Sequence, residues 1–126
     1  MSAMNTPHDT VQSGRVTTEG DDLYYEVRGQ GPPLLLIPPA GGDGWLYAAV
    51  AELLADTYKA ITYDRRANAR STGHAPQNFE ISQQSRDAVA VLRAVGETTA
   101  FVFGNGAVVL KKFSRRHHEE RVAVCL

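Results

Sequence analysis

The chain has 126 residues, of which 43% are hydrophobic and 21% charged, and its formal net charge at neutral pH is −1. This length accommodates at most one domain, and the composition is that of an ordinary soluble globular protein. The near-neutral charge gives no electrostatic reason to expect nucleic acid or an anionic membrane as a partner. The single cysteine, Cys125, excludes an internal disulfide and a multi-cysteine metal site.

The N-terminal residues 1–13 are mostly small and polar, and they lack the apolar run of a signal peptide. We expect them to form a flexible tail before a domain that spans residues 14–126. No stretch approaches the roughly 20 apolar residues that cross a membrane. We therefore expect a cytoplasmic protein, and no motif leads us to expect a cofactor.

Apolar and polar residues alternate in short blocks that predict strands and helices in turn. We expect strands at residues 15–18, 23–28, 33–38, 58–63, 99–103 and 122–126, and helices at 45–57, 82–95 and 106–119. The first two strands flank a turn signal at residues 19–22 and predict an antiparallel hairpin. The later alternation of strands with helices indicates βαβ units. The predicted fold class is therefore α/β, with a mainly parallel sheet, an N-terminal hairpin and flanking helices.

Two of the predicted helices carry apolar residues at helical spacing, which predicts one buried face on each. These residues are Leu46, Val50, Leu53 and Leu54 in the first helix, and Ala88, Val89, Leu92 and Val95 in the second. Trp45, at the start of the first helix, is expected to pack there rather than serve as a substrate platform. Gly96 fits as the stop of the second helix.

Five segments of the chain resemble, in order, segments of α/β hydrolases of the esterase, lipase and cofactor-free haloperoxidase type. They are residues 23–29, 34–42, 63–71, 101–105 and 116–122. Residues 63–71 are similar to the family's Asp-x-Arg-Gly-x-Gly-x-Ser segment, with Ala67 and Ala69 where glycines are usual. The resemblance covers about residues 15–126 and corresponds to the N-terminal half of the family's domain. It implies a partial α/β-hydrolase-like fold.

The resemblance also implies roles for two loops. Residues Ala40, Gly41 and Gly42 match the oxyanion loop, which could present backbone N–H groups to a small carbonyl ligand. The alternative is a glycine-rich turn that has only a structural role and binds no ligand. The equivalents of Asp64, Arg65 and Arg66 order the loop that follows them, so we expect a structural rather than catalytic role for these three residues.

The nucleophile of the family is missing from its expected place. The Gly-x-Ser-x-Gly elbow exposes a serine above the sheet, but the matching residues here begin Gly104, Asn105, Gly106. An alignment with a two-residue gap also leaves no Ser, Cys or Asp there. In the family the acid and the histidine follow the nucleophile, and about 20 residues remain for them in this chain. We therefore expect a truncated hydrolase that does not catalyse the family's hydrolysis of ester-like carbonyl compounds.

Other candidate sites are weaker. Ser71 and His74 form a lone Ser/His pair in a polar loop, and His117 with Glu120 offers too few ligands for structural zinc, so we expect no metal. The alternative function is a non-catalytic module for ligand or protein binding. It would use the loop at residues 39–44 or an open sheet edge, and a homodimer through that edge is the expected partner arrangement.

Overall fold

The structure is a computed structural model that describes residues 11–39, 44–73, 81–104 and 123–124. Its strands are β1 (Val11–Thr18), β2 (Asp21–Arg28), β3 (Pro33–Ile37), β4 (Lys59–Tyr63), β5 (Phe101–Gly104) and β6 (Ala123–Val124). Its helices are the 3₁₀ helix η2 (Gly44–Tyr47), α1 (Ala48–Leu54) and α2 (Ile81–Ala94). Each described element lies within or close to a range predicted from the sequence. The predicted helix at residues 106–119 lies outside the described residues.

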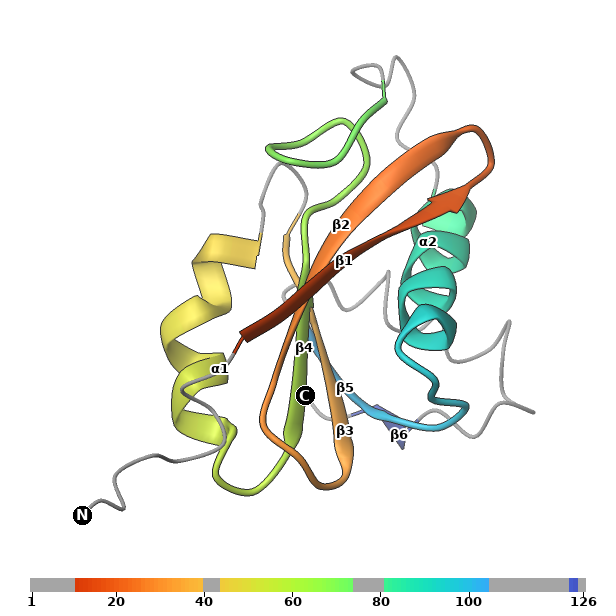
Figure 1. Ribbon diagram of the computed structural model, residues 1–126. Coiled ribbons are helices and arrows are strands. Elements are labelled where there is room, and N and C mark those ends of the chain that lie inside the picture. The colour runs from red at the N-terminus through yellow and green to blue at the C-terminus, as the bar shows by residue number, and fades with distance from the viewer. Residues whose placement is uncertain (1–10, 40–43, 74–80, 105–122, 125–126) are drawn as a thin grey trace.

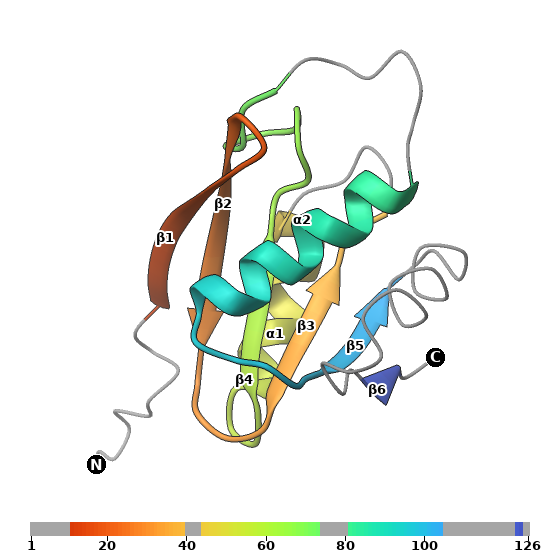
Figure 2. The ribbon, with the colours of Figure 1, turned by 90° about the vertical axis from the view of Figure 1, so that its right-hand side faces the viewer.

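The strands form one sheet in the order β1-β2-β4-β3-β5-β6. Strand β2 pairs antiparallel with β1 and with β4, whereas β3 pairs parallel with β4 and β5, and β5 with β6. Helices α1 and α2 lie on opposite faces of this sheet (Figures 1 and 2). The predicted fold class, a mainly parallel α/β sheet with an N-terminal antiparallel hairpin, is confirmed.

The hairpin begins earlier than the predicted domain boundary at residue 14. Strand β1 starts at Val11, which pairs with Arg28 of β2, so residues 11–13 belong to the sheet and not to the tail. The turn has two central residues, Glu19 and Gly20, with φ of 49° and 90°. Positive φ at both positions matches the right-handed twist of the flanking strands and is typical of a tight hairpin.

The main core lies between α2 and one face of the sheet. It contains Leu23, Val27, Leu35, Ile37, Ile61, Tyr63, Ala88, Val89, Val91, Leu92, Ala100 and Val102. The predicted inward face of the second helix is confirmed, and Val95 packs against this core while remaining partly buried. Gly96 follows the helix with φ of 84°, and its N–H donates to the carbonyl of Arg93. Glycine adopts this left-handed conformation without strain, so the predicted helix stop is confirmed.

The opposite face of the sheet packs on α1 through a smaller cluster. Leu34 and Leu36 of β3 point to this face while Leu35 and Ile37 point to the α2 face, so β3 is covered on both sides. The buried residue of α1 in the cluster is Ala51, with Leu54 partly buried beside it. The side of α1 that faces the sheet is therefore centred on this small alanine, and it differs from the side that the apolar spacing predicted.

The prediction that Leu46, Val50 and Leu53 face the core is therefore wrong. Their exposed fractions are 55%, 43% and 79%. The apolar residues do recur at helical spacing, but they cover more of the surface of α1 than the described sheet contacts. An apolar side of this helix is left without a partner among the described residues.

Candidate functional site

The candidate site lies at the carboxyl ends of the parallel strands. Pro38 follows β3, Asp64 follows β4, and Gly104 is the last residue of β5. The connection after β3 runs to α1 and the connection after β4 to α2, on opposite faces of the sheet (Figure 2). In open α/β sheets, the crevice at such a switch point is where ligands bind. This edge of the sheet is therefore the expected location of a functional site.

Asp64 is fully buried at this edge, and both oxygens of its carboxylate accept hydrogen bonds. Oδ1 accepts from the backbone N–H of Gly44 at 2.7 Å and from Nη2 of Arg70 at 2.9 Å. Oδ2 accepts from the backbone N–H of Arg70 at 3.0 Å and from its Nε at 2.7 Å. Burial on its own raises the pKa of Asp64, but these hydrogen bonds and the charge of Arg70 outweigh it and hold the pKa below its usual value of 3.8. Asp64 is therefore an ionised acceptor that is already engaged.

Asp64 and Arg65 hold the residues at the two ends of the segment between residues 39 and 44, namely Gly44 and Pro38. A side chain at Gly44 would place its Cβ 3.2 Å from Oδ1 of Asp64, so the close approach of the backbone favours glycine. The guanidinium of Arg65 donates to the carbonyl of Pro38 and, at 2.9 Å, to Oε1 of Gln84 in α2. Burial lowers the pKa of Arg65. Two consecutive residues after β4 thus hold both ends of the candidate oxyanion loop.

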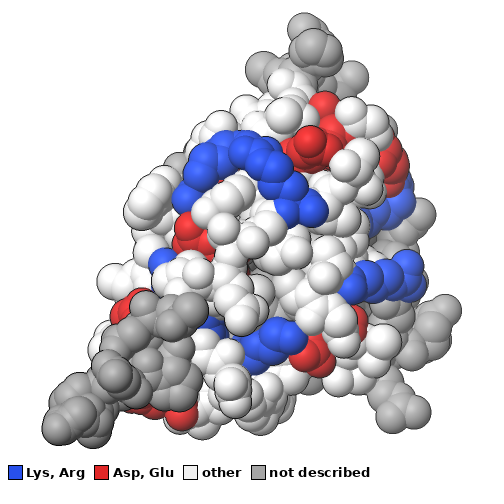
Figure 3. All heavy atoms as spheres, viewed as in Figure 1, with Lys and Arg blue, Asp and Glu red and all other residues white. Residues whose placement is uncertain are grey.

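Arg70 lies between two aromatic rings at the same edge. Its guanidinium carbon is 4.1 Å from the ring centre of Tyr24 and 4.7 Å from that of Trp45, and Nη1 is 3.1 Å from Glu26. The hydrogen bond to Asp64 is the main cause of its raised pKa. Trp45 is 64% exposed, so its packing partner is this cation rather than an apolar core. On the face seen in Figure 3, basic and acidic side chains lie beside one another, and neither sign dominates.

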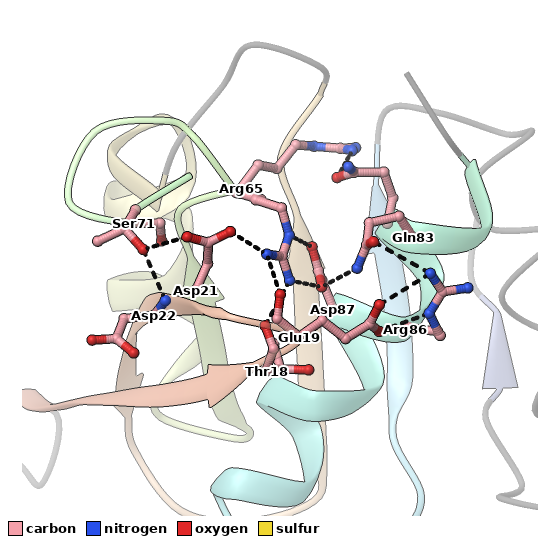
Figure 4. A network of polar contacts seen from close by, with 12 residues as sticks. Thr18, Glu19, Asp21, Asp22, Arg65, Ser71, Gln83, Arg86 and Asp87 are labelled. Carbon is pink, nitrogen blue, oxygen red and sulfur yellow. Dashed lines mark hydrogen bonds and ion pairs between the residues drawn. The ribbon is translucent and has the colours of Figure 1, made fainter. Parts of the chain in front are cut away.

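Arg66 connects the hairpin turn to α2. It donates to both carboxylate oxygens of Asp87, at 3.0 and 2.8 Å, to Asp21 at 2.6 Å and to the carbonyl of Thr18 at 2.9 Å. The hydrogen bond to Asp87 is the main cause of its raised pKa. Figure 4 shows Thr18 and Asp21 from the hairpin and Asp87 from α2 close together, with dashed lines for the hydrogen bonds and ion pairs that join the residues drawn. The loop-ordering role of Asp64, Arg65 and Arg66 stays a prediction, which the variants discussed below test.

The loop that follows these residues contains two alanines in an unfavourable conformation. Ala67 and Ala69 have φ of 68° and 46°, in the left-handed region that favours glycine. They are the two positions at which the resembling family segment has glycine. Backbone hydrogen bonds close the loop, among them Ala67 N–H to the carbonyl of Thr72 and Asn68 N–H to that of Arg65, both at 2.9 Å. The alanines are therefore held in place by their surroundings.

The hydroxyl of Ser71 forms two hydrogen bonds, both with backbone groups. Its hydroxyl donates to the carbonyl of Asp64 at 2.7 Å and accepts from the N–H of Tyr24 at 2.9 Å. Its candidate partner His74 lies outside the described residues, as do Ala40, Gly41, Gly42, Asn105, Gly106, His117 and Glu120. In the described ranges no three His, Cys, Asp or Glu side chains are grouped so that they could hold a metal ion. No helix in these ranges is long and apolar enough to cross a bilayer.

The chain is similar in sequence to proteins that are described as hydrolases. The chain is 35% identical over 114 residues to YraK, an uncharacterised hydrolase of Bacillus subtilis strain 168, covering 88% of the chain and 42% of YraK. It is 37% identical over 84 residues to RutD of Azorhizobium caulinodans, to which carbamate hydrolysis is ascribed, covering 67% of the chain and 31% of RutD. No family model matches the chain.

Among solved structures, the crystal structure of a Nostoc sp. PCC 7120 protein classed as an α/β hydrolase matches with a TM-score of 0.80. The match has 22% sequence identity and covers 93% of the chain and 43% of that protein. At this identity the similarity shows the fold alone. The chain thus spans less than half the length of each of these three proteins.

Proposed function

We propose that the chain, which is similar to hydrolases over less than half of their length and shares their fold, forms one side of a carbonyl-binding site and does not hydrolyse the bound compound by itself. The supporting observation is the double attachment of the 39–44 loop, through Arg65 to Pro38 and through Asp64 to Gly44. These bonds fix the two described positions, Pro38 and Gly44, between which the segment runs. Its backbone N–H groups, at Ala40, Gly41 and Gly42, are the proposed donors to the carbonyl oxygen.

The absence of turnover rests on the groups that a hydrolase would need. The elbow positions Gly104, Asn105 and Gly106 provide no hydroxyl, thiol or carboxylate. Ser71 has its hydroxyl in two hydrogen bonds, and Asp64 has no oxygen without a donor. A serine nucleophile also needs an adjacent base within hydrogen-bond reach, and the two hydrogen bonds of the Ser71 hydroxyl are both with backbone groups. The proposed ligand is an ester or a carbamate. The carbamate is included because carbamate hydrolysis is ascribed to RutD.

Hydrolysis of p-nitrophenyl acetate and of an aryl carbamate by the purified chain tests the first half of this proposal. We expect rates equal to the buffer blank, both for the chain and for Gly106→Ser, since a restored hydroxyl still lacks its base. Saturable turnover that disappears in Ser71→Ala would overturn the proposal. In that case the loop serine, and not the elbow, would carry the chemistry.

Binding is tested separately, by amide chemical shifts during titration with phenyl acetate. We expect shifts at Ala40, Gly41 and Gly42, reduced in Arg65→Lys, which keeps the charge but loses the planar fork that holds Pro38 and Gln84. Lys59→Arg, on the far end of β4, is the matched control and should leave the titration unchanged. Shifts confined to other residues would contradict the assignment of the loop.

A second candidate function is protein binding through a sheet edge. Strand β6 is the last strand on its side of the described sheet, and the outer strand of a sheet offers backbone N–H and C=O groups for pairing with another chain. Pairing of two copies through β6 would satisfy them. Sedimentation velocity at increasing concentration tests this candidate: a monomer–dimer equilibrium supports it, and a monomer throughout contradicts it.

A further inference from the structure

A pocket of about 250 Å³ lies between the hairpin strands β1 and β2 and the C-terminal end of α2. Figure 2 shows this end of the helix beside the two strands. The pocket includes Lys59 at the amino end of β4, whereas the candidate carbonyl site lies at the carboxyl end of that strand, so the two are separate. The lining includes the polar residues Gln12, Tyr25 and Lys59 and the apolar residues Val27, Ala94 and Val95.

A glycine in the neighbouring strand gives Tyr25 its place in this pocket. Gly14 of β1 pairs with Tyr25 of β2 across the hairpin. A Cβ at Gly14 would lie 2.5 Å from the hydroxyl oxygen of Tyr25, so the phenol lies against β1 only because position 14 has no side chain. The ring also packs against the main core while the residue remains partly buried. The Tyr25 hydroxyl is thus positioned by both strands of the hairpin.

Two acceptors hold the ammonium group of Lys59 at the helix end of the pocket. It donates to the carbonyl of Val95 and to the carboxylate of Glu97, each at 2.8 Å. An ammonium group has three N–H donors, so a third donor is left for a ligand. The ion pair with Glu97 already balances the charge of Lys59, and the C-terminal end of a helix carries a partial negative charge. This end of the pocket therefore favours a neutral acceptor over an anion.

Gln12 and Tyr25 supply groups that both donate and accept hydrogen bonds. In the part of the chain that the structure describes, neither the Gln12 amide nor the Tyr25 hydroxyl has a hydrogen-bond partner. Ser13 also borders the pocket, but it pairs with Glu26, and side chains alternate between the faces of a strand. Its hydroxyl therefore lies on the face away from α2. The polar groups available to a ligand are the amide, the phenol and the third ammonium proton.

We propose that this pocket binds a neutral compound with several hydroxyl groups, of the size of a monosaccharide. The hydroxyl groups of the ligand accept from Lys59 and exchange hydrogen bonds with Gln12 and Tyr25, because each of them can donate and accept. The C–H groups of its ring lie on the apolar wall. The pocket is smaller than the roughly 300–1,000 Å³ of sites for drug-sized ligands, which sets the size of the compound. The proposal does not rest on the proposed function.

Amide chemical shifts of the full chain during titration with D-glucose, D-ribose and myo-inositol test the proposal. We expect saturable shifts at Gln12, Tyr25 and Val95 with at least one of the three compounds. Tyr25→Phe and Gln12→Ala should each lower the affinity about fivefold, since each removes one hydrogen-bonding group. Ser13→Ala is the matched control in the same strand and should leave the affinity unchanged. Sodium gluconate, an anion of similar size to glucose, should bind more weakly than the neutral compounds.

Gly14→Ala tests the position of the phenol while every polar group of the pocket is kept. Its Cβ displaces the end of the Tyr25 side chain, so the affinity should fall about as far as in Tyr25→Phe, and the double variant should lose no more than Tyr25→Phe alone. Circular dichroism of each variant establishes that it is folded. The proposal is overturned if none of the three neutral compounds gives saturable shifts at these residues. Tighter binding of gluconate, or an affinity that Tyr25→Phe leaves unchanged, also overturns it.

Discussion

The carboxylate of Asp64 lies 2.7 Å from the backbone nitrogen of Gly44, which precedes it by 20 residues. This bond joins the end of β4 to the start of η2 across the carboxyl edge of the sheet. The next residue, Arg65, reaches back in the same way to Pro38 at the end of β3. Pro38 and Gly44 are thus both held by residues that directly follow the neighbouring strand β4.

Replacement of Asp64 by alanine should destabilise the chain by about 2–4 kcal/mol, because it leaves the buried N–H of Gly44 and the guanidinium of Arg70 without their acceptor. Urea denaturation followed by tryptophan fluorescence measures this change, since Trp45 stacks on Arg70. Asp22→Ala is the matched control. Asp22 accepts an exposed hydrogen bond from Thr17, and its loss should cost about 0.5 kcal/mol or less. Equal losses in the two variants would contradict a special role for Asp64.

The depressed pKa of Asp64 makes its contribution depend on pH in a defined direction. The folded state holds the carboxylate ionised below its usual pKa of 3.8, so the stabilisation is complete above that value and is lost as pH falls through the folded pKa. The difference in unfolding free energy between the wild type and Asp64→Asn should therefore be largest at neutral pH and shrink below pH 3.8. Taking the difference removes the effect of Glu19, whose pKa is also lowered, chiefly by its hydrogen bond to Arg86. A difference that is independent of pH would contradict this prediction.

Glycine at position 67 or 69 should stabilise the chain. Both alanines have positive φ, which costs an L-residue about 1–2 kcal/mol. Glycine removes this cost, but it also raises the conformational entropy of the unfolded chain, which offsets part of the stabilisation. We expect each of Ala67→Gly and Ala69→Gly to raise the unfolding free energy by about 0.5–1 kcal/mol. Ala90→Gly, in the middle of α2, is the control and should lower it by about 1 kcal/mol. The prediction fails if all three substitutions destabilise, as measured by urea midpoints at constant slope.

The sequence predicted the elements and their order because each has a local signature. The apolar run of β3 indicated a strand buried on both faces, and the apolar spacing and terminal glycine of α2 gave that helix its face and its end. Helix α1 shows the limit of such patterns. Its apolar residues surround more of the helix than one contact can bury, and only tertiary packing decides that Ala51 faces the sheet while Leu53 faces solvent.

The candidate site was predictable only in part, for a related reason. Its residue types were evident in the segment from Asp64 to Ser71, but the partners of these residues are distant in the sequence. Gly44 has no side chain to suggest a bond to Asp64, and the carbonyl of Pro38 carries no sequence signal at all. The two strained alanines have a faint signal, since they stand where a resembling segment has glycine, yet their φ angles follow only from the closed loop.

Arg66 and Arg86 offer a matched test of how burial changes the value of an ion pair. Arg66 binds Asp87, whose side chain is 1% exposed, through two nitrogens, whereas Arg86 binds Glu19, whose side chain is 41% exposed. Lysine keeps the charge but loses the planar pair of donors, so Arg66→Lys should destabilise by about 1–2 kcal/mol and Arg86→Lys by less than about 0.5 kcal/mol. Thermal unfolding at low and high salt measures both, and added salt should weaken the exposed pair more than the buried one. If the two variants lose equal stability, the bonds of Arg66 to Asp21 and Asp87 do not stabilise the contact between the hairpin and α2.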